Sequence, residues 1–114
     1  MGEAFTIPAV AGRRIERALA FVRAGAADDE PAVLALLLSD GRWHHTSLDP
    51  SGVVTWIAWT TLLEEPGTRA IELPVLGGEI IESVEADAAL TVRLRSGRVL
   101  RLSPRGAGAV LSLV

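Results

Sequence analysis

The chain has no cysteine, no lysine and no tyrosine among its 114 residues. Without cysteine it can form no disulfide and offers no thiolate to a metal or to nucleophilic catalysis. A chain that does not depend on oxidation suits a reducing compartment, so we expect a cytoplasmic protein. Without lysine, no Gly-x-x-x-x-Gly-Lys phosphate loop can exist. We expect no cofactor and no metal.

Long apolar runs are also missing. The longest, Ala32–Leu38, is too short to cross a bilayer. Met1–Val10 shows no basic segment followed by an apolar stretch, so we expect neither a signal peptide nor a membrane partner. The formal net charge of −3 argues against general affinity for nucleic acid, which needs a basic surface.

Two parts of the chain resemble each other. A shift of 56 residues places Ala32–Ala58 on Ala88–Val114, and 8 of the 27 aligned pairs are identical. The turn glycines Gly41 and Gly97 coincide, and so do alternate apolar positions. We therefore predict a single domain, residues 1–114, with an internal repeat (12–63 and 77–114) joined by a linker (64–76).

The second copy shows the strand pattern most clearly. Apolar and polar residues alternate along Leu90–Leu94, which predicts a half-buried strand before a turn at Gly97. An odd-numbered loop ending at Gly97 pairs Val92 with Leu100 and keeps the apolar residues on one face. A two-residue loop would place arginine on that face.

The whole pattern predicts an all-β protein made of two four-stranded antiparallel meanders, roughly eight to nine strands, arranged as a small sandwich or a closed barrel. Gly12–Arg23 and Val53–Glu65 also fit helical spacing, so one short helix remains an alternative. Val110–Val114 is too apolar for an open sheet edge. We expect it to pair within the domain or with a second copy, which would give a homodimer.

His44 is the main candidate for acid–base chemistry. In the repeat it occupies the inward position that Leu100 holds in the second copy. It serves either as a hydrogen-bonded core residue or, if the protein is an enzyme, as a proton carrier in a polar pocket.

The three tryptophans are all in the first copy: Trp43, Trp56 and Trp59. Three roles are open for them: packing in the core, lining a binding site or anchoring a partner. Trp56 and Trp59 are three residues apart and should face opposite sides of a strand, so at least one lies outside the main core. An uncovered tryptophan would indicate a partner.

Basic residues gather in the second copy, where residues 88–114 hold five arginines and no acid. Arg93, Arg95 and Arg101 share the outward face. They form either exposed ion pairs with Glu79, Glu82 and Glu85 or a docking patch for an acidic protein or a phosphate.

The sequence contains no recognisable catalytic cluster, so we interpret the protein first as a small non-enzymatic intracellular binding protein. We expect an interaction, inhibitor or immunity module that masks a protein partner. The alternative is a β-barrel that binds a small apolar molecule, such as a cyclase or isomerase, with His44 and the tryptophans at its site.

Overall fold

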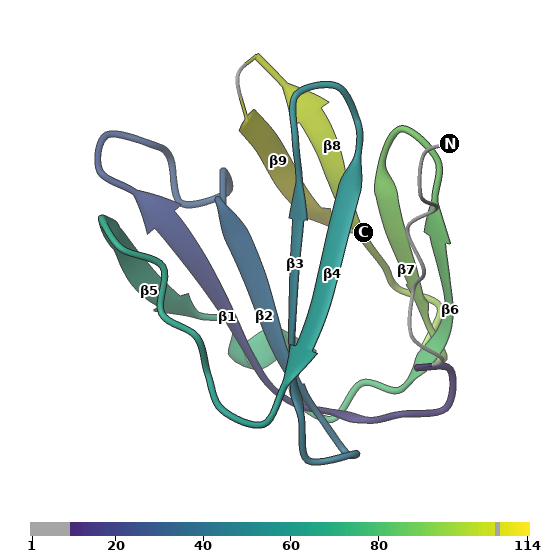
Figure 1. Cartoon of the computed structure of the whole chain (residues 1–114). Coiled ribbons are helices and arrows are strands. Elements are labelled where there is room, and N and C mark those ends of the chain that lie inside the picture. Colours follow the sequence, from purple (N-terminus) through teal and green to yellow (C-terminus); the bar gives the residue numbers. More distant parts are fainter. Residues whose placement is uncertain (1–9, 107) are drawn as a thin grey trace, which may run out of the picture.

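The computed structural model describes residues 10–106 and 108–114, and in this part of the chain it is built almost entirely of strands (Figure 1). The strands are β1 (Ile15–Arg23), β2 (Val33–Leu38), β3 (Trp43–Leu48), β4 (Val54–Trp59), β5 (Thr68–Glu72), β6 (Ile81–Ala86), β7 (Leu90–Leu94), β8 (Val99–Arg105) and β9 (Gly108–Leu113). A single 3-10 turn, Pro74–Leu76, is the only helical element among the described residues. The prediction of an all-β fold is confirmed.

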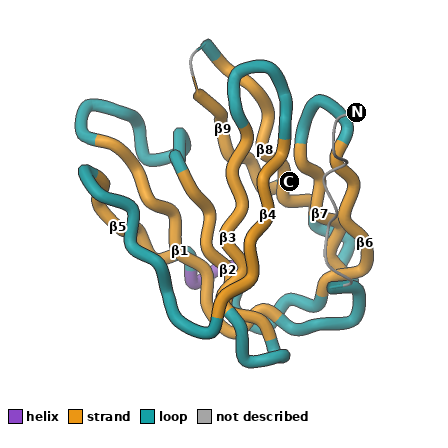
Figure 2. The backbone as a smooth tube through the Cα atoms, in the orientation of Figure 1, coloured by secondary structure: helices purple, strands orange, loops and turns teal. Residues whose placement is uncertain are grey.

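The strands form two antiparallel sheets, with orders β4-β3-β2-β1-β5 and β6-β7-β8-β9. Within each sheet, β1 to β4 and β6 to β9 lie in chain order, as in two meanders, and Figure 2 shows the loops that join them. β5 is an addition to the first meander and lies beside β1. The closed barrel, one of our two expected arrangements, is wrong: the sheets keep separate edges, and β5 occupies the side of β1 that closure could have used.

The predicted register of the β7–β8 hairpin is confirmed. Val92 lies opposite Leu100, and Leu90 opposite Leu102. The β2–β3 hairpin repeats this register, with Leu36 opposite His44. Both turns use a glycine with positive φ, +81° at Gly41 and +96° at Gly97, a conformation that glycine adopts without strain.

The two meanders contact each other through reciprocal backbone hydrogen bonds. Gly12 N–H donates to the Ile81 carbonyl at 2.7 Å, and Gly78 N–H donates to the Ile15 carbonyl at 2.8 Å. Both donors lie three residues before the isoleucine that begins their own first strand. This pairing fits a pseudo-twofold relation between the units. Descent of the units from one duplicated ancestor stays a prediction.

The last hairpins of the two meanders differ by one residue. Thr46 lies opposite Trp56, whereas the matching Leu102 lies opposite Leu111. The 56-residue shift predicted Ser112 as the counterpart of Trp56, and this prediction is wrong: the counterpart is Leu111. The reason is the loop: a longer turn joins β3 to β4 than joins β8 to β9.

The main core fills the space between the sheets. Its largest fully buried members come from both meanders: Ile15, Leu34, Leu36, Leu38, Leu76, Ile81, Leu90, Leu94, Leu100 and Leu102. On β2, β7 and β8 these residues occupy alternate positions, so alternation places their side chains inward, whereas Leu76 comes from the 3-10 turn.

Both segments with ambiguous spacing are resolved. Gly12–Arg23 contains β1, and Val53–Glu65 contains β4 followed by an irregular stretch. The C-terminal strand pairs with β8, as expected. We expected no signal peptide in Met1–Val10. Apart from Val10, these residues lie outside the described part of the chain.

In the described part of the chain, no helix has the length and apolar character needed to cross a membrane.

Candidate functional site

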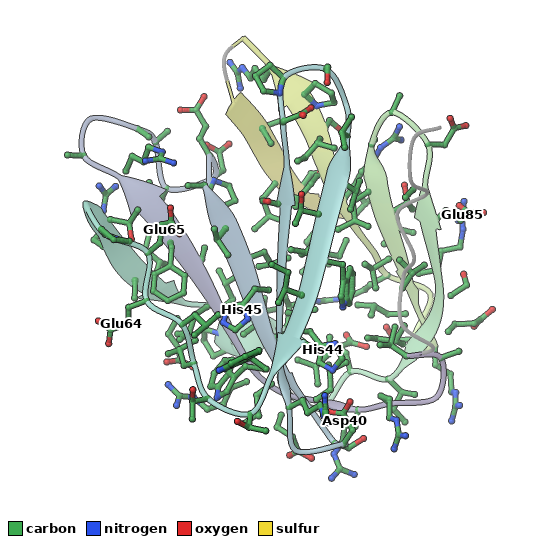
Figure 3. The ribbon with its side chains drawn as sticks, in the orientation of Figure 1. Asp40, His44, His45, Glu64, Glu65 and Glu85 are labelled. Atoms are coloured by element: carbon green, nitrogen blue, oxygen red, sulfur yellow. The ribbon has the colours of Figure 1, made fainter. Side chains whose placement is uncertain are left out.

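His44 lies on the inward face of β3 and is 2% exposed, as predicted. Its Nε2 is 2.9 Å from Asp40 Oδ2, and its Nδ1 accepts a hydrogen bond of 3.0 Å from Trp56 Nε1–H. The tight β2–β3 turn brings Asp40 beneath the ring, as Figure 3 shows. Because Nδ1 acts as an acceptor and Nε2 faces a carboxylate, the proton of the neutral ring is on Nε2.

Asp40 is held as a carboxylate in this arrangement. Burial acts to raise its pKa, but hydrogen bonds from the Arg42 backbone N–H and from His44 outweigh it and leave the pKa below its usual range. A histidine that acts as a general base needs a free lone pair directed at the substrate. Both ring nitrogens of His44 are already engaged, so this geometry supports a structural role and gives no support to acid–base catalysis.

His45 points to the opposite side of β3 from His44, toward the segment that carries Glu64 and Glu65 (Figure 3). Its Nε2 accepts the backbone N–H of Leu63 at 3.0 Å and so fastens the chain after β4 over the outer face of the sheet. Burial lowers the pKa of His45, and the neighbouring His44 adds to this, against an opposing effect of the Ile57 backbone.

Stability should therefore fall as the pH drops below about 6.5, the pKa of histidine in an unfolded chain. The folded state keeps His45 neutral, so the unfolded state binds a proton that the folded state does not. The loss continues until the pH reaches the lower folded-state pKa, at no more than about 1.4 kcal/mol per pH unit for this one proton. Urea unfolding at several pH values between 8 and 5 measures this decline in the free energy of unfolding.

His45→Gln is the matched control for this effect. Glutamine can still accept the Leu63 N–H but does not titrate, so the variant should show a shallower decline in unfolding free energy. An equally steep decline in the variant would exclude His45 as the cause.

The three tryptophans occupy three different environments. Trp56 is 6% exposed and lies in the main core, its ring edge-on to that of His44. Trp43 is on the outer face of the five-stranded sheet, where a smaller apolar cluster and the guanidinium of Arg17 cover it. Trp59 is on the same outer face but is 53% exposed. The prediction that Trp56 and Trp59 face opposite sides is confirmed by these exposures.

Large apolar side chains are exposed beside Trp59. Ile57 and Trp59 lie on the outward row of β4, Val53 stands immediately before the strand in the same alternation, and Leu63 follows on the segment bonded to His45. Each of the four is between 43% and 56% exposed. His45 lies directly opposite Ile57 across the strand pair, so the Leu63 backbone is close to this row. We call Val53, Ile57, Trp59 and Leu63 the β4 patch.

β4 also ends the sheet, and no other strand of the described residues pairs with its outer side. The other edge strands are less open to pairing. On β9, the Leu111 N–H donates to the Asp29 carbonyl of the β1–β2 loop at 2.7 Å. β5 and β6 carry charged side chains, which discourage strand addition: Arg69, Glu72, Glu82 and Glu85. β4 has neither charge nor proline.

The predicted arginine face is present on the four-stranded sheet, where Arg93, Arg95 and Arg101 are all exposed. Arg93 Nε lies 3.5 Å from a carboxylate oxygen of Glu85. Both partners are more than half exposed, and such pairs contribute little to stability. The face is available to an acidic partner, but its charge is partly neutralised.

A groove of about 280 Å³ lies between the β1–β2 loop and β9, lined in part by Arg23, Glu30 and Arg105. Neither His44 nor any tryptophan lines it. The groove therefore does not unite the residues that the sequence analysis selected for a small-molecule site.

The structure joins His44 and Trp56 by a hydrogen bond, and it places Trp43 directly opposite Trp59 across β3 and β4. Asp40, His45 and Leu63 also belong to the site, and none of them was predicted as a site residue from the sequence. A signal existed for Asp40, because a carboxylate in the turn four residues before an inward histidine can reach back to its ring. Among residues 10–106 and 108–114, no three histidine or acidic side chains are grouped so as to hold a metal ion.

Comparisons with known proteins find no protein family, no curated protein and no solved structure that this chain matches.

Proposed function

We propose that this chain is a non-enzymatic protein-binding module and that its docking surface is the β4 patch together with the free edge of β4. The partner contributes an extended segment that hydrogen-bonds to the β4 backbone and lays alternate apolar side chains against Ile57 and Trp59. This is recognition by strand addition. Masking of a partner, as by an inhibitor or immunity protein, is the biological form we propose, in the cytoplasm.

The observation that carries this proposal is a coincidence of two features on one strand. Scattered single apolar residues on a surface are ordinary, whereas a contiguous exposed patch indicates an interaction site. Here half-exposed Ile57 and Trp59 lie on a strand whose outer backbone groups have no partner strand among the described residues. An extended peptide can pair with the free backbone groups and also cover the apolar side chains. A soluble small molecule fits this combination less well.

The small-molecule alternative lacks a comparable observation. The sheets do not close into a barrel. The ring nitrogens of His44 are both engaged, and Trp56 is packed against that ring.

Selection from a library of displayed linear peptides tests the proposal without a known partner. We expect the recovered peptides to alternate apolar and polar residues, because only every second side chain reaches the outer face. A double variant, Ile57→Ser with Trp59→Ser, should weaken their binding at least about tenfold, since anchors of this kind dominate binding energy. Affinities of synthetic copies of these peptides, measured by titration, give the readout.

The arginine face supplies the competing surface. A triple variant with Arg93, Arg95 and Arg101 changed to serine should bind the same peptides as the parent does. Recovery of no peptides, or of acidic peptides that lose binding only in the arginine variant, would contradict docking at β4.

A further inference from the structure

The geometry points to a second copy of this chain as a partner for β4, in an antiparallel dimer with its twofold axis at Trp56. This inference rests on the proposed function, because it names one extended segment that the strand-addition surface accepts. The dimer would join two five-stranded sheets into one continuous ten-stranded sheet, doubling the 5-stranded sheet of each copy.

The backbone of β4 presents its free groups in a symmetric set. Asp49 N–H bonds to the Val53 carbonyl, and in an antiparallel pair such bonded positions recur at every second residue. The backbone groups of Val54, Trp56 and Ala58 therefore point away from β3. An axis at Trp56 pairs Trp56 with itself and Val54 with Ala58 of the second copy, so every one of these groups gains a partner.

The side chains agree with the same axis. On the outer face, Val53 meets Trp59 of the second copy and Thr55 meets its Ile57. The half-exposed Val53 and Trp59 thus cover each other, and Ile57 packs against Thr55. On the inner face, Val54 and Ala58 are both small and apolar. An axis at Thr55 would instead bring Trp59 against the polar Ser51 of the turn, and an axis at Ile57 would bring Val53 against Thr61.

The interface between β4 and its copy is small and apolar, since no residue of β4 is charged. Interfaces well below the standard size give weak complexes, so we expect a dissociation constant on the order of 10–100 μM. Because neither copy of β4 brings a charged residue into the contact, added salt should leave the dimer intact. Association through the arginine face would weaken with salt.

Sedimentation of the whole chain from about 1 to 500 μM tests for the dimer, a range that brackets the expected constant. The parent should pass from monomer to dimer across this range. Ile57→Glu should weaken dimerisation at least about tenfold, because it buries a charge in the contact. Val75→Glu is the matched control, since Val75 is 51% exposed and lies away from β4 in the 3-10 turn. Equal dimerisation by the parent and the Ile57 variant would overturn the inference.

The register can be tested by disulfide formation, because the chain has no cysteine of its own. Thr55 and Ile57 of the second copy face each other without a direct backbone bond, the closer type of cross-strand pair. A mixture of the Thr55→Cys and Ile57→Cys variants should therefore cross-link preferentially as the mixed pair. Faster self-linking by the Thr55 variant alone, or by the Ile57 variant alone, would place the axis elsewhere and overturn this register.

The two proposals fail separately. A chain that stays monomeric at 500 μM, at least about fivefold above the expected constant, yet still binds library peptides at β4 overturns the dimer and leaves the strand-addition function. A chain that binds no peptide at β4 and stays monomeric overturns both.

Discussion

Replacement of Trp56 by alanine is expected to destabilise the fold by about 3–5 kcal/mol, the cost of removing a large aromatic side chain from a packed core. Trp56 is 6% exposed, and its Nε1–H donates a hydrogen bond to His44 Nδ1. The variant therefore creates a cavity and also leaves a buried acceptor without its donor. A loss of this size is a large part of the roughly 5–15 kcal/mol that stabilises a domain.

Trp59→Ala provides the matched comparison. Trp59 lies on the same strand but is 53% exposed, so the same truncation should cost less than about 1 kcal/mol. Urea unfolding followed by far-ultraviolet circular dichroism reports both values without depending on tryptophan emission. Similar costs at the two positions would show that the assignment of inner and outer faces on β4 is wrong.

Trp56→Phe separates the hydrogen bond from the packing. Phenylalanine keeps most of the ring in the core but lacks the indole N–H, so His44 Nδ1 loses its donor. We expect an intermediate cost of about 1–3 kcal/mol, typical of a buried polar atom left unsatisfied. A cost equal to that of Trp56→Ala would mean that the ring is lost from its place in the core.

Local chemistry made much of the fold predictable. The β7–β8 register follows from the rule that paired residues share a face and from the position of Gly97, and the structure has that register. Similarity between the repeats then carried the same pairing to His44 in the first meander. Strand faces depend only on residue parity, which is why the inward position of His44 could be assigned from sequence.

The contacts of the candidate site could not be predicted from the alternation of residues along a strand. The bond between Trp56 and His44 requires the β3–β4 register, and this hairpin departs by one residue from its counterpart in the second meander. Coverage of Trp43 requires the irregular segment after β4 to fold back over the sheet, held by the bond from Leu63 to His45. Such a return is a tertiary event with no periodic signal in the sequence.

The choice between sandwich and barrel was equally out of reach from sequence. Closure depends on which edge strands meet, and two meanders have the same alternation in either case. The decisive element is β5, a short strand with no counterpart in the second meander, which takes the remaining side of β1.

The free edge of β4 should also be visible in the exchange of its backbone amides with solvent. The amides of Thr55, Ile57 and Trp59 point toward β3, whereas those of Val54, Trp56 and Ala58 point outward. A paired amide exchanges only when the strand opens, but an outward amide on an uncovered edge exchanges without opening. We expect rates to alternate along β4 by on the order of 100-fold.

Hydrogen exchange by NMR, residue by residue along β4, is the most direct measurement of this docking edge. It is best made on the Ile57→Glu variant, in which dimerisation is weakened, and on the parent at high concentration. We predict fast exchange at Val54, Trp56 and Ala58 in the variant and slower exchange at the same amides in the parent. Strong protection of all three amides in the monomeric variant would show that β4 is already covered within one chain, and would contradict its role as the docking strand.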